Sequence, residues 1–328
     1  MALAIPTTLA AVLVVFVAIR LLPNNPVLAR FGQHAVPEKV ELAMRAQGWD
    51  RPVWEQAGRF FWRLATTGDL GVSFTTPERV SAGLLRTFPA TIELACVALC
   101  LALPLGIAAG VAAAVWRNRF PDYLCMTGSL LGVSVPVFFL GICLIAAFPQ
   151  MPTSGRLPTG MWFERDTEFI LVESLVRGRW DVFTAALRHI CLPAIALSTV
   201  PMPLIARITR SSMLEVLSSD YIRTARAKGN PPWRVIWRHA FPNASIPVAN
   251  IGGLQVAQLL TGAVLTESVF SWPGLGRYLV EAVLRSDYNV VQGATLLIAG
   301  VFVLANLAVD ALYAALDPRL RTREAADA

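Results

Sequence analysis

The chain has 328 residues, of which 55% are hydrophobic and only 15% are charged, with a formal net charge of +6. Soluble globular chains contain about 45–50% apolar and about 25% charged residues, so the composition argues against an ordinary cytosolic enzyme. It also excludes a disordered chain. The basic residues gather in a few loops instead of covering one face, so we expect no nucleic-acid partner. The five cysteines form no CxxC pair and are expected to be small buried residues.

Six apolar stretches are long enough to cross a bilayer, whose core of about 30 Å requires roughly 20 residues per helix. In chain order they are residues 3–22, 89–116, 123–148, 190–206, 246–266 and 290–316. The first is a full span without the positive n-region of a signal peptide, which favours a retained helix over a cleaved leader. The sequence therefore predicts an all-α polytopic membrane protein with six transmembrane helices. Prolines at 104, 136, 201 and 203 are candidate kinks in these helices.

The distribution of basic residues predicts how the helices are oriented. Residues 207–243 contain seven Lys or Arg and only two acidic residues, and Arg117 and Arg119 lie in a turn on the same side. Arg319, Arg321 and Arg323 in the tail belong to that side as well. Because short loops rich in Lys and Arg stay in the cytoplasm, we expect this side and both termini to be cytoplasmic.

The domain organisation follows from these spans. We assign residues 1–22 to the first transmembrane helix, 23–87 to an external segment, 88–318 to a core with five transmembrane helices, and 319–328 to a cytoplasmic tail. The external segment contains Trp49, Trp54, Trp62 and a Gly68-Asp69 turn signal, which indicates a small folded element. Glu93, near the outer end of the second span, is expected to have a structural role, snorkelling or pairing with Arg86.

Residues 218–242 carry the most informative pattern. Asp220 can cap a short helix, and Gly229 can take the left-handed conformation that ends it. Pro232 suits the first turn of a second helix, which Pro242 would stop before Asn243 caps the next span. One face of this second helix would hold Trp233, Ile236, Trp237 and Ala240. Such a hairpin could dock in a groove of a cytoplasmic partner or lie among lipid headgroups, and the residues alone leave both possibilities open.

This segment resembles the coupling loop, or EAA motif, of ATP-binding-cassette importer permeases. Gly229 matches the motif's glycine, and Arg223-Thr224-Ala225 occupies the EAA positions, so the motif's glutamate is absent. That variant is similar to the oligopeptide, dipeptide and nickel branch, in particular its B-type dipeptide and oligopeptide permease subunits. Further resemblance lies at residues 68–73 (GDLGVS), 88–95 (FPATIELA), 269–276 (VFSWPGLG) and 317–319 (DPR).

The resemblance implies a type I importer permease in a bacterial inner membrane, with an external segment between helices 1 and 2. Its implied partners are a second, homologous permease subunit, two cytoplasmic ATPase subunits and an extracytoplasmic solute-binding protein, besides membrane lipid. ATP and Mg²⁺ would bind the ATPases, with no cofactor in this chain. The implied coupling residues are Arg223, Thr224, Ala225, Lys228, Gly229, Trp233, Ile236, Trp237 and Arg238. The implied docking residues for the solute-binding protein are Trp272, Pro273, Gly274 and Gly276.

Short peptides are the substrate that the resemblance implies, with nickel or another small solute as an alternative. A membrane-embedded enzyme or an ATP-independent channel are alternatives of another class. The chain has no Walker A sequence, no HExxH pair among its three histidines and a proline, Pro136, where a nucleophile elbow needs glycine. We therefore expect no catalytic residues and no metal site.

Overall fold

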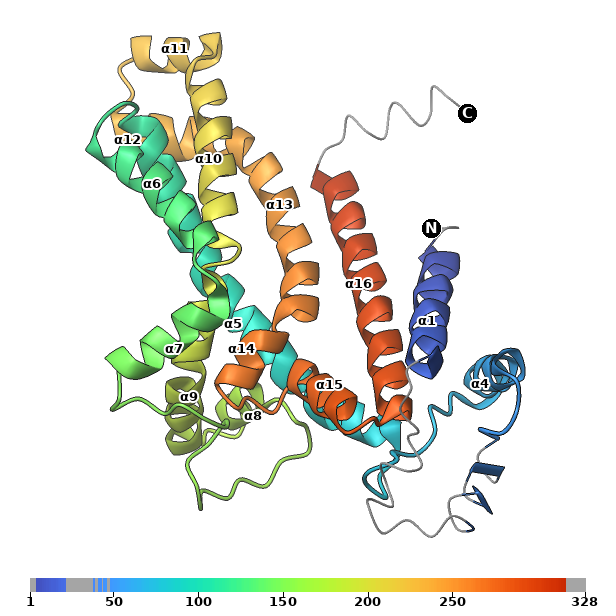
Figure 1. Cartoon of the computed structure of the whole chain (residues 1–328). Helices are drawn as coiled ribbons and strands as arrows, with labels where there is room; N and C mark the ends of the chain where they lie inside the picture. Colours follow the sequence, from blue (N-terminus) through green and yellow to red (C-terminus); the bar gives the residue numbers. More distant parts are fainter. Residues whose placement is uncertain (1–3, 22–37, 39–40, 43, 46–47, 317–328) are drawn as a thin grey trace, which may run out of the picture.

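The computed structural model describes residues 4–21, 38, 41–42, 44–45 and 48–316 (Figure 1). Within this part the regular structure is helical, and an isolated antiparallel bridge joins Val72 to Arg79. The helices are α1 (Ala4–Leu21), α4 (Val53–Thr67), α5 (Val80–Val115), α6 (Phe120–Ser134), α7 (Val137–Ala147), α8 (Ile170–Val176), α9 (Trp180–Ser198), α10 (Met202–Leu217), α11 (Asp220–Ala227), α12 (Pro232–Arg234), the π-helix η2 (Val235–Ala240), α13 (Phe241–Gly262), α14 (Val264–Val269), α15 (Leu275–Leu284) and α16 (Tyr288–Leu316). The all-α class is confirmed.

Each of the six predicted crossings falls on helical structure. Three helices of the described part are long and apolar enough to span a bilayer alone, namely α5, α9 and residues 288–309 of α16, and the bent pair α6–α7 can form a fourth span. The first and fifth predicted crossings coincide with α1 and α13, of 18 and 22 residues. At 36 residues, α5 is about 54 Å long and exceeds the bilayer core. It begins at Val80, so the predicted domain boundary at 87/88 lies inside it.

The third predicted span, 123–148, is wrong as one straight helix. Helix α6 ends at Ser134 and α7 begins at Val137, with a bend of 102° between them. Pro136 causes the break, because proline has no N–H to donate and disfavours helical backbone in the residue before it. Val135 accordingly has extended backbone, with φ −87° and ψ 121°.

The fourth predicted span, 190–206, has the wrong bounds, because it straddles the break between α9 and α10. Helix α9 ends at Ser198 and α10 begins at Met202. Two features weaken the helix there. Pro201 and Pro203 donate no backbone hydrogen bond, and the hydroxyl of Thr199 bonds the carbonyl oxygen of Ala196 at 2.7 Å.

Helix α5 is the centre of the molecule and contacts α6, α9, α10, α13, α15 and α16. Most residues of its buried face are small (Gly, Ala or Thr), which allows close helix packing. A Cβ on Gly110 would lie 2.5 Å from the carbonyl oxygen of Ala206, and one on Gly106 would lie 2.9 Å from Cγ2 of Ile205. Glycine at these positions therefore lets α10 pack directly against α5.

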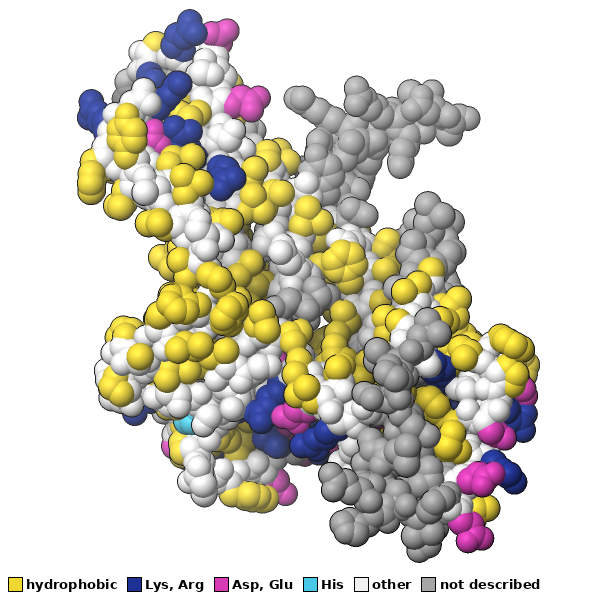
Figure 2. Space-filling model, in the orientation of Figure 1, with side chains coloured by type: hydrophobic (Ala, Val, Ile, Leu, Met, Phe, Trp, Pro, Cys, Tyr) yellow, Lys and Arg dark blue, Asp and Glu magenta, His cyan; other side chains and the backbone are white. Residues whose placement is uncertain are grey.

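The two ends of the molecule differ. Helices α11 and α12 lie at the top of Figure 1, at the same end as the start of α1 and the end of α16. We call this the hairpin end, and Figure 2 shows Lys and Arg side chains gathered there. Helices α4, α8, α14 and α15 lie toward the other end, which we call the loop end (Figure 1). The residues 317–328, which include the predicted tail, are outside the described part.

The described part of the external segment is folded, as its tryptophans and turn signal predicted. Phe60 of α4 stacks on Phe16 of α1 with ring centroids 5.7 Å apart. Gly68, at φ +64°, ends α4, and the Asp69 carboxylate accepts a hydrogen bond from the Gly71 N–H at 2.9 Å. Trp49 lies against Tyr288, at the start of α16. Residues 23–37, 39–40, 43 and 46–47 of this segment lie outside the described part.

Candidate functional site

The coupling hairpin, residues 220–240, consists of α11, a turn at Gly229, and α12 continued by η2. Gly229 has φ +74°, the left-handed conformation that its place in the motif predicted. The Asn230 side-chain amide donates a hydrogen bond to the Ala225 carbonyl oxygen at 2.9 Å, which satisfies a free carbonyl at the end of α11. Asp220 begins α11 but makes no capping hydrogen bond, since Ser219 occupies the N-cap position.

The inner side of the hairpin is packed into the bundle. Ile222, Val235 and Ala240 are buried, in one cluster with Met213 of α10 and Val111 of α5. Burying a side chain such as Val or Ile contributes about 1.5–3 kcal/mol. The hairpin is thus fixed to the ends of α5 and α10.

The predicted apolar face of the second helix is wrong in part. Trp233 and Trp237 are 61% and 50% exposed, Ile236 is half-buried, and Ala240 is fully buried. Residues 235–240 form a π-helix, whose hydrogen bonds join residues five apart, so Val235 and Ala240 face the bundle together. The two tryptophans are therefore left on the outer side.

Pro242 does not stop the second helix, contrary to the prediction. The π-helix passes directly into α13, which begins at Phe241. In an α-helix the Pro242 ring would clash with the carbonyl four residues earlier, and the wider π-turn leaves room for it. Asn243 consequently lies inside α13, where its amide donates to the Tyr221 hydroxyl at 2.8 Å and connects α13 to α11.

The remaining predicted coupling residues lie mostly on the outer surface of the hairpin. Arg223, Thr224, Lys228, Gly229 and Arg238 are exposed. Ala225 is the exception, at 8% exposure. Arg223 makes a loose ion pair with Asp220 at 3.2 Å, and Arg234 lies over the ring of Trp233. The outer surface thus combines two exposed indoles with several exposed cations.

An ion pair that the sequence did not predict links α6 and α10, the two helices next to the hairpin. The carboxylate of Asp122 in α6 accepts from both Nε and Nη2 of Arg210 in α10, the latter at 2.8 Å. Asp122 also accepts the Asn118 N–H at 2.9 Å, in the turn before α6. These residues are 88 apart in the chain, so no local spacing could reveal the pair.

At the loop end, the structure buries most of the predicted docking residues. Trp272 is only 2% exposed and donates its indole N–H to the Ala90 carbonyl oxygen at 2.9 Å. Gly274 and Gly276 are also buried, and only Pro273 is exposed. Trp272 therefore ties the loop to α5 rather than presenting an aromatic surface.

A buried carboxylate explains why residue 274 is a glycine. Glu267 is fully buried and accepts hydrogen bonds from the Thr91 hydroxyl at 2.6 Å and from the Arg277 N–H at 3.0 Å. A Cβ on Gly274 would lie 2.3 Å from this carboxylate. The Thr91 hydroxyl in turn accepts the Leu275 N–H at 2.8 Å. The loop 267–277 is thereby held on α5 by a polar contact that sequence spacing did not indicate.

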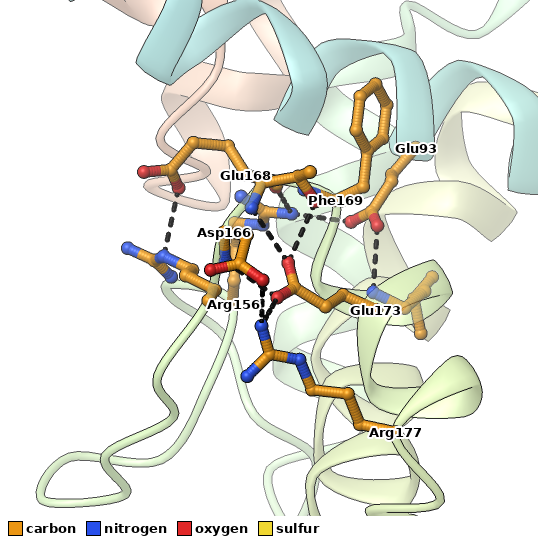
Figure 3. A network of polar contacts seen from close by, with 10 residues as sticks. Glu93, Arg156, Asp166, Glu168, Phe169, Glu173 and Arg177 are labelled. Carbon is orange, nitrogen blue, oxygen red and sulfur yellow. Dashed lines mark hydrogen bonds and ion pairs between the residues drawn. The ribbon is translucent and has the colours of Figure 1, made fainter.

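A second polar network holds the loop between α7 and α9 (Figure 3). Glu93 has a structural partner, as expected, but that partner is Arg156 at 2.6 Å and not Arg86, which pairs with Glu78. Both Glu93 and Arg156 are buried, at 5% and 7% exposure, and Arg156 also donates to the Glu168 carbonyl oxygen at 2.7 Å. The other oxygen of Glu93 accepts the Leu171 N–H at 2.8 Å.

Glu173 organises the rest of this network (Figure 3). Its carboxylate accepts the backbone N–H groups of Asp166 and Thr167, at 2.7 and 3.0 Å, and pairs with Arg177. Burial raises the pKa of Glu173, but these hydrogen bonds outweigh it and hold the pKa below the usual value for glutamate. The loop is therefore braced by an ionised carboxylate at neutral pH. No group of three or more potential metal ligands occurs among the described residues.

A helical bundle with several membrane-crossing helices, a basic hairpin fixed at one end and braced loops at the other has the architecture of a membrane transport permease. The chain belongs to the family of binding-protein-dependent transport system inner membrane components, whose family model matches residues 102–322. This range includes the whole coupling hairpin and excludes the external segment.

Relatives match nearly the whole chain. It is 45% identical to a di/tripeptide transport system permease protein of Pseudomonas aeruginosa, over 97% of this chain and 96% of the relative. It is 41% identical to a dipeptide transport system permease protein of Escherichia coli, over 98% and 97%. A glutathione transport system permease protein of E. coli is 38% identical, over 97% and 95%.

Proposed function

We propose that this chain is the permease subunit of an ATP-driven importer that moves short peptides across the bacterial inner membrane by alternating access. The peptide assignment is supported by relatives named for dipeptide and di/tripeptide transport, each covering nearly all of the chain. The chain itself is a permease without an ATPase sequence, so the energy of ATP enters through separate subunits. ATP and Mg²⁺ belong to those subunits.

The coupling hairpin is the structural observation that supports this function best. Exposed Trp side chains with neighbouring Arg are typical of residues that contribute most to a protein interface. Trp233 and Trp237 therefore anchor an ATPase subunit, and Arg223, Lys228 and Arg238 supply the charged rim. Thr224 and Gly229 lie on the same exposed surface, while Ala225 and Ile236 support it from inside.

Movement of the hairpin is transmitted to the membrane helices by covalent and packing contacts. Helix η2 is continuous with α13, and the cluster around Ile222 fixes the hairpin to α5 and α10. An ATPase that pulls on the hairpin therefore moves α10 and α13 with it. Coupling requires that the ATPase state and the orientation of the transport path share a free energy, and this rigid connection provides it.

At the opposite end, we place the solute-binding protein on the loops around Pro273. Pro273 is exposed on a loop held by Trp272 and Glu267, and Trp162, on the neighbouring loop, is 77% exposed. The braced loops offer a preformed surface, which lowers the entropic cost of binding. The transport path lies between this chain and a homologous second permease subunit. The start of α1 and the end of α16 lie on the hairpin side (Figure 1), which we assign to the cytoplasm.

Photocrosslinking tests the hairpin contact. A benzophenone amino acid is placed at Trp237 and, as a matched control, at Leu284, which is 79% exposed at the loop end. In membranes that contain the whole transporter, we expect position 237 to crosslink to an ATPase subunit and position 284 not to. Crosslinking of position 237 only to lipid would show that the hairpin lies in the headgroups, and would contradict the coupling role.

Uptake separates the importer from an ATP-independent channel. Proteoliposomes with the complete transporter are loaded with ATP or with ADP, and labelled dipeptide enters from the side of the solute-binding protein. We expect accumulation only with ATP. Equal uptake with ADP would favour a channel, and ATP-driven uptake of Ni²⁺ without uptake of peptide would assign the chain to metal transport.

A further inference from the structure

A cavity of about 890 Å³ lies among the external segment, α1 and α16, and no role described so far uses it. Five arginines line it, whereas Asp69 is the only carboxylate among its described lining residues. The arginines are Arg20, Arg45, Arg51, Arg59 and Arg63. Trp49, Phe60 and Phe74 add aromatic walls. The cavity therefore combines a positive lining with apolar surface.

Some of the five arginines have carboxylate partners and others have none among the described residues. Arg45 pairs with Glu41, while Arg51 and Arg59 share Glu55, and these pairs are exposed. Among the described residues no carboxylate lies within ion-pair distance of Arg20 or Arg63. Arg20 is held by neutral acceptors, the Gln56 side-chain oxygen at 2.8 Å and the Phe16 carbonyl at 3.2 Å, and by the rings of Phe16 and Trp49. Its position is thus fixed, and no carboxylate of the described part pairs with its charge.

A buried amide on α16 is also unpaired. Gln292 borders the cavity and is 1% exposed, yet within the described part of the chain neither its side-chain nitrogen nor its oxygen has a hydrogen-bond partner. Buried amides normally form hydrogen bonds, because an amide that leaves water loses its hydrogen bonds to water and is destabilised unless protein groups replace them. A group that enters the cavity with one donor and one acceptor side by side would satisfy both atoms. A peptide bond is such a group.

We propose that this cavity is a binding site for short peptides at the loop end of the permease. The free C-terminal carboxylate of the peptide pairs with Arg20 and Arg63, and an adjoining peptide group bonds to Gln292. Peptide side chains lie against Trp49 and Phe74, and the N-terminal ammonium is attracted by Asp69. The proposal rests on the proposed function for its substrate class, and adds a place where peptide is held outside the transport path.

Calorimetry on the complete transporter in lipid nanodiscs tests this site. Trialanine is the probe, compared with trialanine amide, which lacks the carboxylate, and with inorganic phosphate. We expect amidation and the substitution Arg20→Gln each to weaken binding about tenfold or more, since both remove a charge-assisted contact. Arg79→Gln is the matched control, because Arg79 is exposed in the same segment and does not line the cavity.

Gln292→Leu keeps the test decisive if Arg20→Gln fails to fold. Leucine has a similar size and removes an unpaired buried amide, so we expect unchanged or higher thermal stability together with weaker trialanine binding. Unchanged trialanine binding in this variant would overturn the proposal. Competition by phosphate as strong as by trialanine would show a general anion site and would also overturn it.

The experiments distinguish failure of the proposed peptide site from failure of the proposed importer function. If ATP-driven uptake of trialanine persists while none of the cavity substitutions affects trialanine binding, the cavity assignment is wrong and the importer function stands. If trialanine binds at the cavity but uptake does not depend on ATP, the importer function is wrong and the binding site stands.

Discussion

Gly229 shows how one residue can determine the geometry of the hairpin without packing against anything. Its φ of +74° lies in the region that residues with a Cβ avoid, yet a Cβ built on it would meet nothing within 4 Å. A substitution there therefore costs backbone strain alone, about 1–2 kcal/mol. Gly68, at the opposite end, has the same two properties, with φ +64° and open space around it.

This pair gives a matched test of coupling. We expect Gly229→Val to leave the protein in the membrane at normal amount but to reduce ATP-coupled peptide uptake several-fold, because the turn between the two arms of the hairpin is distorted. Gly68→Val carries the same strain far from the hairpin and should retain uptake per ATP hydrolysed. Equal uptake per ATP in Gly229→Val and in the unmodified protein would refute the role of the turn in coupling.

The ion pairs of Arg156 and Arg86 give a second test, of stability. Breaking a buried pair leaves a carboxylate without compensation and costs about 3–5 kcal/mol, whereas an exposed pair contributes about 0–1 kcal/mol. We therefore expect Arg156→Met to lower the thermal unfolding midpoint strongly, since it strands Glu93, and Arg86→Met to change it little. Scanning fluorimetry in detergent measures both. Similar midpoints for the two variants would show that the Glu93 contact does not stabilise the loop.

The hairpin is an element with two differently composed sides. Ile222, Val235 and Ala240 fix it to the bundle, and Trp233 and Trp237 are left outside because the π-helix places residues five apart on the inner face. A regular α-helix would have turned the face with Trp237 toward the same side as Ala240. The irregular helix therefore decides which aromatic side chains are available to a partner.

Removing one exposed indole should weaken the contact with the ATPase. Truncation of a dominant interface residue typically costs about 2 kcal/mol or more, which is about thirtyfold in affinity. We expect Trp237→Ala to reduce co-purification of the ATPase subunits without lowering the amount of permease. Trp162→Ala, at a tryptophan 77% exposed at the loop end, is the control and should co-purify normally. Equal losses in both variants would point to general destabilisation instead.

Considered as a whole, the molecule has two ends, which are joined by the unbroken helix α5 and by the two interrupted helix pairs α6–α7 and α9–α10. The bend at Pro136 and the break between α9 and α10 lie next to each other, since a Cβ on Gly132 would lie 3.1 Å from Pro203. On the hairpin side are α6 and α10, joined by Asp122 and Arg210, and on the loop side are α7 and α9. We expect movement of the hairpin to be absorbed at these interruptions.

The orientation of the whole chain is tested by labelling of single cysteines. The five native cysteines are first replaced by alanine or serine, and a cysteine is introduced at Lys228 or at Pro273, both exposed. In spheroplasts we expect a membrane-impermeant maleimide to label position 273 directly and position 228 only after the membrane is permeabilised. The reverse pattern would place the hairpin outside the cell and would contradict the importer assignment.

Hydrophobic runs and turn residues were sufficient to predict the helical class, the apolar segments that form helices and the turn at Gly229. These features are local, because they depend on apolar length and on the backbone freedom of glycine. The third crossing was wrong as one straight helix, and the fourth had wrong bounds, because both contain prolines. Whether a proline bends, breaks or is accommodated in a helix depends on what packs beside it, as Pro136 and Pro242 show with opposite outcomes.

From the amino-acid order alone follow the membrane class, the charged side and the position of the hairpin, since each depends on composition and short spacing. Tertiary structure decided that Glu93 pairs with Arg156, that Glu267 bonds Thr91, and that Trp272 is buried while Trp237 is exposed. Glu93 and Arg156 are 63 residues apart in the chain, and Thr91 and Glu267 are 176 apart, so only the packing of the helices brings each pair together. The placement of Gln292 and Arg20 at the same cavity depends on the same long-range packing.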